Sequence, residues 1–120
     1  DDILQSGINV IVDITLGWEF HWRNLDEIVG RNPTVVFLPL VLLCPREQAM
    51  ARIQGRYEAR PDYYSPATEY ATEQKHQNIW DFLQKLDRPG VQFVDASGTQ
   101  NEVYDTIRAY VTERMKTCTR

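Results

Sequence analysis

Apolar residues run almost unbroken over residues 35–43, where Pro39 is the one interruption. A run of this kind, bounded by turn signals, is typical of a strand that is buried on both faces, as in parallel sheets. Cys44-Pro45 ends the run, because proline lacks the N–H that a strand ladder needs and suits the first turn of a helix. The pattern therefore predicts a buried strand over residues 35–43 and a helix directly after it.

Apolar residues at three- and four-residue spacing predict the helices. The helix after Pro45 carries Arg52, Arg56 and Arg60 four residues apart, which places the three side chains on one face of the helix. Three other stripes predict helices: Trp18, Trp22, Leu25 and Val29; Ile79, Phe82, Leu83 and Leu86, within residues 67–86; and Val103, Ile107, Tyr110 and Val111. Thr99 is the expected N-cap of the last of these helices, and Glu102 follows three residues later, which is the spacing of a capping box.

Two more apolar stretches predict strands, Ile8–Ile14 and Val91–Asp95. In the first stretch we expect Val10, Ile11 and Val12 to be buried. Strands that alternate with helices imply parallel pairing through right-handed crossovers.

The predicted fold class is therefore α/β, a three-layer α/β/α sandwich with a parallel sheet, in a single domain over residues 1–120. Open sheets commonly have about four to six strands. We therefore expect the missing strands to precede Asp1.

Composition and charge narrow the range of functions. The net charge of −4 disfavours a general nucleic-acid coat, because such domains are usually basic. Local positive charge on an acidic protein points to a small anionic ligand instead. Cys44 and Cys118 are expected to be free thiols in a reducing compartment, and the nine-residue apolar run is shorter than the roughly 20 residues that span a bilayer. The sequence therefore predicts a cytoplasmic protein with no membrane partner.

Polar residues at the carboxyl ends of the predicted strands are candidate site residues, because ligands of open α/β sheets bind there. Asp13 and Thr15 follow the first strand, and Ser97-Gly98-Thr99 follows the last. Asp13 could hold Mg²⁺ through water or accept a proton from a substrate hydroxyl, or it could cap the next turn.

The arginine residues are the other candidates. Arg23 could reach a phosphate or pair with Asp26 or Glu27. The row of Arg52, Arg56 and Arg60 could be a solvated face that contacts Glu47 or Glu58, but guanidinium groups are also the preferred bidentate partners of phosphate. Because a segment with two prolines follows at residues 61–66, we interpret residues 52–66 as a lid-like segment that holds phosphate.

The order of these motifs resembles the P-loop kinase superfamily, in particular its zeta-toxin-like, chloramphenicol-phosphotransferase-like and adenylylsulfate-kinase-like members. The resemblance rests on GINVIVDIT with Arg23 after it, on LLCPREQAMARIQGR, and on VQFVDASGTQNEVYDTI. It covers nearly the whole chain. The phosphate-binding motif G-x-x-x-x-G-K-[ST] of that superfamily is absent from these 120 residues, and we expect it to precede them.

The resemblance implies ATP and Mg²⁺ as cofactors. It places Asp13 near Mg²⁺ and the transferred phosphoryl group, and Arg52 and Arg56 on the ATP phosphates. It places Ser97, Gly98 and Thr99 beside the base, and Arg23 on the phosphoryl acceptor or a product phosphate. Thr15 and Arg60 are further candidates for substrate binding.

The predicted function is an ATP-dependent phosphotransferase that acts on a hydroxyl of a small molecule or nucleotide. A nucleic-acid end as acceptor is not favoured, and a homo-oligomer is possible. Two alternatives stay open, a non-catalytic scaffold that lacks the phosphate-binding loop and a sulfotransferase.

Overall fold

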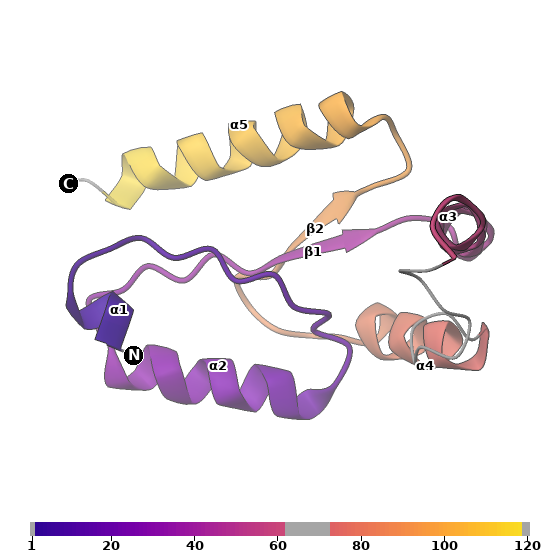
Figure 1. Cartoon of the computed structure of the whole chain (residues 1–120). Helices are drawn as coiled ribbons and strands as arrows, with labels where there is room; N and C mark the ends of the chain where they lie inside the picture. The colour runs from indigo at the N-terminus through magenta and orange to yellow at the C-terminus, as the bar shows by residue number, and fades with distance from the viewer. Residues whose placement is uncertain (1, 62–72, 119–120) are drawn as a thin grey trace.

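The computed structural model of the chain describes residues 2–61 and 73–118, and within them two strands lie among helices along the sequence (Figure 1). The elements are α1 (Asp2–Gln5), α2 (Glu19–Arg31), β1 (Leu40–Leu43), α3 (Arg46–Ala59), α4 (Glu73–Gln84), β2 (Gln92–Asp95) and α5 (Gln100–Cys118). Helices form where the three- and four-residue periodicity predicts them. The part of the predicted helix over residues 67–72 lies outside the described residues.

The two strands pair in parallel, as the alternation of strands and helices predicts. Their register runs from Leu40 opposite Gln92 to Leu43 opposite Asp95. Figure 1 shows α5 on one side of the strand pair, α2 and α4 on the other, and α3 beyond the carboxyl end of β1. The chain is therefore a mixed α/β protein with a small parallel sheet.

β1 is shorter than predicted and begins at Leu40 instead of Val35. Pro39 lies directly before it and has no N–H to donate to a ladder. Its carbonyl oxygen still accepts a hydrogen bond of 3.0 Å from the backbone N–H of Gln92. Pro39 therefore marks the point where pairing starts, and residues 35–38 lie outside the strand.

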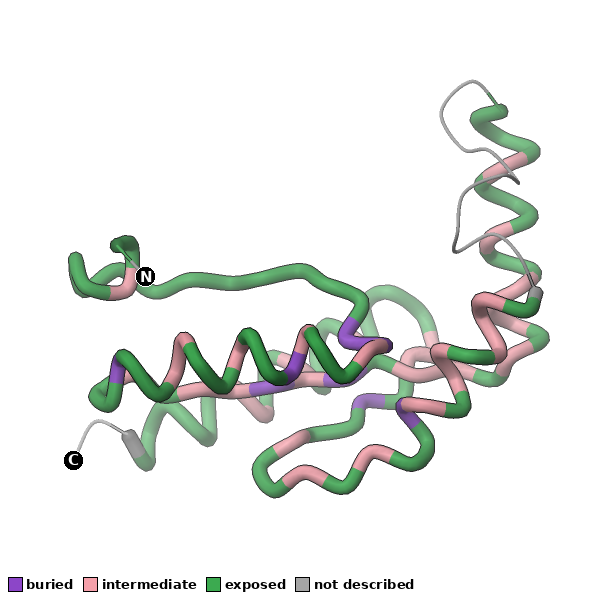
Figure 2. Tube along the Cα trace, turned by 90° about the horizontal axis from the view of Figure 1, so that it is seen from below, coloured by how far each residue is buried: buried purple, intermediate pink, exposed green. Residues whose placement is uncertain are grey.

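The prediction of a buried strand over residues 8–14 is wrong. The segment is extended but unpaired (Figure 1), and Figure 2 shows it exposed along its length. Its three central side chains are exposed instead of buried: Val10 by 42%, Ile11 by 98% and Val12 by 59%. Apolar composition favours a strand, but a strand also needs a neighbour for its backbone, and within the described residues the sheet consists of β1 and β2 alone.

The core lies between α2, α4 and one face of the strand pair. Leu16, Trp22, Val41 and Leu83 form its buried cluster, and Trp22 is fully buried. Half-buried apolar residues surround this cluster: Leu25, Leu43, Ile79, Phe82, Leu86 and Val91. The predicted stripes of α2 and α4 therefore supply most of the core.

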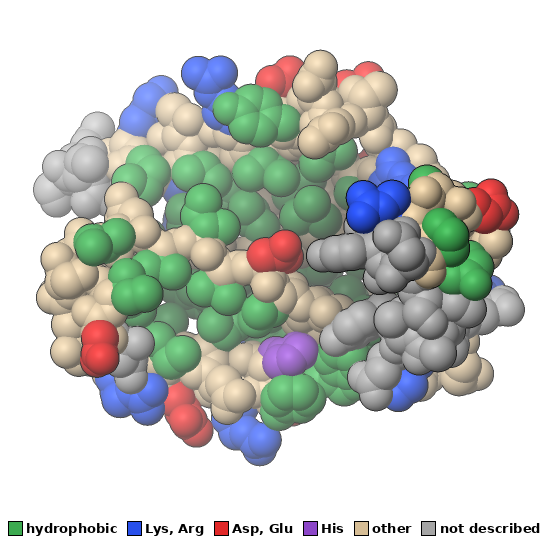
Figure 3. Space-filling view, in the orientation of Figure 1, with side chains coloured by type: hydrophobic (Ala, Val, Ile, Leu, Met, Phe, Trp, Pro, Cys, Tyr) green, Lys and Arg blue, Asp and Glu red, His purple; other side chains and the backbone are tan. Residues whose placement is uncertain are grey.

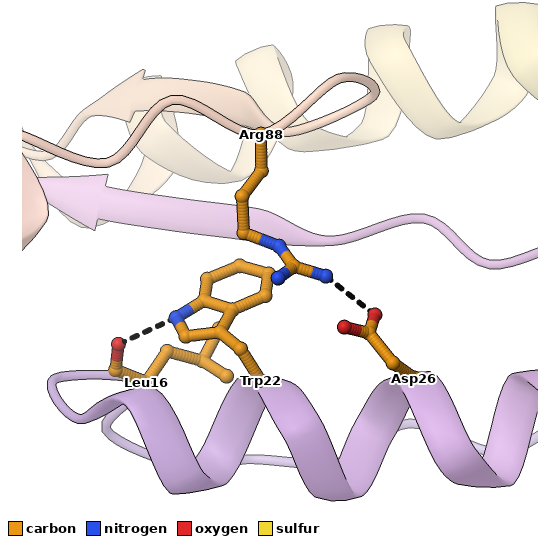
Figure 4. A network of polar contacts seen from close by, with 4 residues as sticks. All are labelled: Leu16, Trp22, Asp26 and Arg88. Atoms are coloured by element: carbon orange, nitrogen blue, oxygen red, sulfur yellow. Dashed lines mark hydrogen bonds and ion pairs between the residues drawn. The ribbon is translucent and has the colours of Figure 1, made fainter.

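Trp22 is held by polar contacts as well as by packing (Figure 4). Its indole Nε1 donates a hydrogen bond of 3.0 Å to the carbonyl oxygen of Leu16. The guanidinium carbon of Arg88 lies 4.8 Å from the centre of the Trp22 ring, and Arg88 also forms an ion pair with Asp26. Arg88 thus joins α2 to the turn that follows α4 through a cation–π contact and an ion pair.

Candidate functional site

The carboxyl ends of β1 and β2 open onto a cleft of about 750 Å³. This size lies within the range of about 300–1,000 Å³ that is usual for small-ligand sites. We name it the carboxyl-edge cleft, and its walls include Cys44, Arg46, Gln77, Trp80, Phe93 and Asp95. The cleft therefore lies where an open α/β sheet is expected to bind a ligand.

The loop after β2 is held in place by α3. Arg52 donates hydrogen bonds from Nη1 to the carbonyl oxygen of Ala96, at 2.8 Å, and from Nη2 to that of Gly98, at 3.4 Å. Gln48, one turn earlier on the same helix, donates from Nε2 to the carbonyl oxygen of Ser97 at 2.8 Å. Three successive carbonyls of the loop thus accept hydrogen bonds from one helix, and the structure brings Arg52 together with the predicted residues 97–99.

Hydrogen bonds also fix the beginning of this loop. The carboxylate of Asp95 accepts a hydrogen bond of 2.6 Å from the Ser97 hydroxyl and one of 2.9 Å from the Ser97 backbone N–H. These two bonds, the hydroxyl bond first, lower the pKa of Asp95, because hydrogen bonds to a carboxylate favour its charged form. Asp95 therefore places a negative charge in the wall of the carboxyl-edge cleft.

The end of the loop is the predicted capping box. The backbone N–H of Thr99 donates to Glu102 Oε2 at 3.0 Å, and the backbone N–H of Glu102 donates to Thr99 Oγ1 at 3.2 Å. Gly98 lies against this cap, since a Cβ at residue 98 would fall 2.2 Å from Glu102 Oε2. The prediction of the cap is confirmed, and the Thr99 hydroxyl accepts one of its two hydrogen bonds.

Arg46 adds a positive charge to the wall of the cleft. His76 lies near enough to Arg46 to be affected by this charge. Burial, and then the positive charge of Arg46, lower the pKa of His76, because both disfavour the protonated ring. The Nδ1 atom of His76 is buried and makes no hydrogen bond to any of the residues that the structure describes. Neither residue is singled out by the sequence pattern, and the position of Arg46 directly after Cys44-Pro45 is the available signal.

All three arginines of the row are exposed, but the contact of Arg56 differs from those of Arg52. Arg56 is exposed, and its Nε donates to the carbonyl oxygen of Arg52 at 3.4 Å. Arg60 lies just beyond α3, with the non-helical φ of −137°. Arg60 is the C-cap of α3, and its backbone N–H still donates to the carbonyl oxygen of Arg56 at 2.9 Å. The predicted lid-like segment over residues 52–66 extends beyond the described residues.

Asp13, Thr15 and Arg23 are not brought to the cleft. All three are exposed, and in the described part of the chain no hydrogen bond or ion pair joins them to α3 or to residues 95–99. Asp26, a possible partner of Arg23, pairs with Arg88 instead. The structure therefore gathers Arg52 with residues 97–99 and leaves the predicted metal and acceptor residues apart.

Comparisons of the chain with models of protein families, with curated proteins and with solved structures found no match. No group of three or more His, Cys, Asp or Glu side chains that could hold a metal ion occurs among the described residues. Within the same residues, no helix is long and apolar enough to cross a membrane.

Proposed function

We propose that the chain is part of an ATP-dependent phosphotransferase of the P-loop kinase superfamily, with a three-layer α/β/α fold. It transfers the γ-phosphoryl group of ATP to a hydroxyl of a small molecule or nucleotide. The observation that supports this best is the contact of Arg52 with Ala96 and Gly98 beside a ligand-sized cleft. This contact joins α3, the helix after β1, to the loop after β2. Both elements lie at the carboxyl ends of the parallel strands, where nucleotides bind in such sheets.

Arginine side chains lie near this edge, together with the carboxylates of Glu47 and Asp95, and the arginines are the groups that could bind an anionic ligand. Arg52 uses only two N–H groups of its guanidinium for the loop, so other donors of the group remain for a phosphate. Arg56 is exposed one turn further along α3, and Arg46 lines the cleft. Together they supply positive charge where phosphoryl transfer requires stabilisation of negative charge.

Mg²⁺ would be held chiefly by the phosphates of ATP, because Mg²⁺ in such sites takes one or two carboxylates and keeps several waters. Asp13 is the carboxylate proposed for this role. In the structure Asp13 is exposed on the unpaired segment of residues 8–14, so this role requires that segment to change its position. Bound Mg²⁺ would neutralise charge on the transferred group.

A scaffold is the second candidate function, and one contact favours it. In the structure Arg52 binds backbone carbonyls, so the side chain already has a role in fixing the loop. A protein in which Arg52 serves this role alone would keep the shape of the nucleotide edge without binding nucleotide.

Thermal unfolding with and without Mg-ATP tests the proposal, because a ligand that binds only the native state raises the unfolding temperature. We expect Mg-ATP to raise the midpoint, and Arg56→Ala to reduce this shift while leaving the ligand-free midpoint unchanged. Arg108→Ala is the matched control, since Arg108 is an exposed arginine on α5.

Each outcome separates the candidates. No shift with Mg-ATP would contradict the phosphotransferase and favour the scaffold. A shift with adenosine 3′,5′-bisphosphate but not with Mg-ATP would favour the sulfotransferase. Equal shifts for Arg56→Ala and Arg108→Ala would remove Arg56 from the site.

A further inference from the structure

We propose that the carboxyl-edge cleft binds a planar heteroaromatic ring that carries an amino group, as adenosine and cytidine do. The ring stacks on Trp80, and its amino group donates a hydrogen bond to the carboxylate of Asp95. Both residues line the cleft, whose volume is about 750 Å³. A cleft of this size holds a ligand as large as a nucleoside.

Trp80 supplies aromatic surface to the wall of the cleft. It lies on α4 three residues after Gln77, and both side chains belong to the lining, as residues on one face of a helix do. Trp80 is half-buried, and within residues 2–61 and 73–118 its ring contacts no other aromatic ring. Aromatic surface of this kind is a stacking platform for planar rings.

Other apolar residues extend this wall. Phe93 of β2 is 42% exposed and lines the cleft together with Leu43 and Val94. Small-ligand sites usually have such a lining, in which apolar residues provide most of the contact and a few polar groups set the orientation of the ligand. The question is then which polar group in this cleft is fixed in position.

Asp95 is that group. The backbone N–H and the hydroxyl of Ser97 both donate to its Oδ1 atom, whereas Oδ2 accepts no hydrogen bond from the residues that the structure describes. The same two bonds lower the pKa of Asp95, so the carboxylate is ionised at neutral pH. An ionised carboxylate accepts hydrogen bonds and donates none. Oδ2 is therefore a fixed acceptor that selects an amino group and repels a carbonyl oxygen.

The charges of the wall favour an uncharged ring over an anion. The carboxylates of Glu47 and Asp95 stand there against the guanidinium of Arg46. Anionic groups have better partners further along α3, where Arg52 and Arg56 are exposed. Figure 3 shows Lys and Arg side chains on the side of the molecule where α3 lies in Figure 1. A ring in the cleft and a phosphate on α3 therefore use different groups of the same edge.

The ring belongs to the phosphoryl acceptor, and this assignment rests on the proposed function, whereas binding of the ring does not. In that function the base of ATP lies at residues 97–99, which leaves the carboxyl-edge cleft for the acceptor. Asp95 lines the cleft and also begins the loop that Arg52 holds. The acceptor class is then a hydroxylated compound with an amino-substituted aromatic ring, such as a nucleoside.

Isothermal titration calorimetry of the full chain with two pairs of nucleosides tests this inference. Adenosine and cytidine carry an amino group where inosine and uridine carry a carbonyl oxygen, and the members of each pair differ chiefly in that group. We expect adenosine and cytidine to bind at least about tenfold more tightly than inosine and uridine, because a hydrogen bond to a charged group contributes such a factor.

Two pairs of variants locate the contacts. Asp95→Asn should abolish the preference, because an amide both donates and accepts. Ser97→Ala is its control, since it removes the hydroxyl that bonds Asp95 but keeps the carboxylate, and it should keep the preference. Trp80→Leu should weaken the binding of adenosine and cytidine about tenfold through the loss of stacking. Phe20→Leu removes a 47% exposed ring of α2 that is not part of the lining, and it should bind as the wild type does.

Equal affinities within each pair of nucleosides, or no binding of any of the four, would overturn the inference. A preference that survives in Asp95→Asn would overturn it too, and so would equal losses in Trp80→Leu and Phe20→Leu. The titrations contain neither ATP nor Mg²⁺, so their failure is separate from failure of the phosphotransferase. If the amino nucleosides bind and Mg-ATP does not, the ring site stands and only its role as the acceptor site is lost.

Discussion

The indole of Trp22 donates its hydrogen bond to the carbonyl oxygen of Leu16, and Leu16 has a φ of 56°. This left-handed conformation is uncommon for a residue with a Cβ and costs about 1–2 kcal/mol. Leu16 is nevertheless buried in the core. The conformation directs both the side chain and the carbonyl of Leu16 toward the core cluster, and it lies where the exposed residues 8–14 join the core.

Replacing Trp22 with phenylalanine should destabilise the protein by about 1–3 kcal/mol, because the buried carbonyl of Leu16 loses its hydrogen-bond donor. The contact with Arg88 weakens as well, since phenylalanine is a poorer cation–π partner than tryptophan. Urea unfolding measures the change. Trp80→Phe is the control, because the Trp80 indole makes no hydrogen bond within the described part of the chain and is half-buried. An equal loss in both variants would show that ring size matters and the hydrogen bond does not.

Gly17→Ala should destabilise the fold, because a Cβ at residue 17 would lie 2.8 Å from Cγ2 and 2.9 Å from Cγ1 of Ile79. Overpacking of this kind typically costs about 1–3 kcal/mol. Gly30→Ala is the matched change in α2, where a Cβ has nothing within 4 Å. It should stabilise the protein by about 0.5–1 kcal/mol, since alanine favours a helix over glycine. Denaturant midpoints that move in the same direction for both variants would contradict this close contact.

Thr99→Ala should cost about 0.5–2 kcal/mol by removing the cap of α5. The loss should appear in thermal unfolding and as faster hydrogen exchange at the Glu102 amide, which donates to Thr99 Oγ1. Thr106→Ala removes a hydroxyl that bonds the Glu102 carbonyl inside the helix, so it should be neutral or slightly stabilising. If Thr106→Ala is as harmful as Thr99→Ala, the capping box is not the source of the stability.

Stability should fall as the pH is lowered from about 7.5 to about 5.5, across the ordinary histidine pKa near 6.5. The pKa of His76 is lower in the folded protein, so the unfolded chain takes up protons first. The unfolded state therefore binds more protons in this window, and the free energy of unfolding decreases as the pH falls. His76→Gln should reduce this dependence. Urea unfolding at the two pH values provides the test, and an unchanged slope would assign the effect to other groups.

The spacing of apolar residues and of capping residues along the chain was enough to predict the helices and the start of α5. The stripe of Trp22 and Leu25 identifies α2 because one apolar face must turn to the core. Thr99 and Glu102 identify a cap because the two partners are three residues apart. The targets of Arg52 could not be read in the same way, since Ala96 and Gly98 are more than forty residues further along the chain.

The sequence by itself determined the helices and the cap, because neighbours along the chain decide each of them, whereas it did not determine which of the three apolar segments pair as strands. Only the tertiary structure decided that Arg52 holds a loop, that Arg88 packs on Trp22, and that residues 8–14 are unpaired. An apolar segment becomes a strand only when another backbone accepts its hydrogen bonds. The composition of residues 8–14 favours such pairing, but the partner for it depends on which edges of the assembled sheet are open.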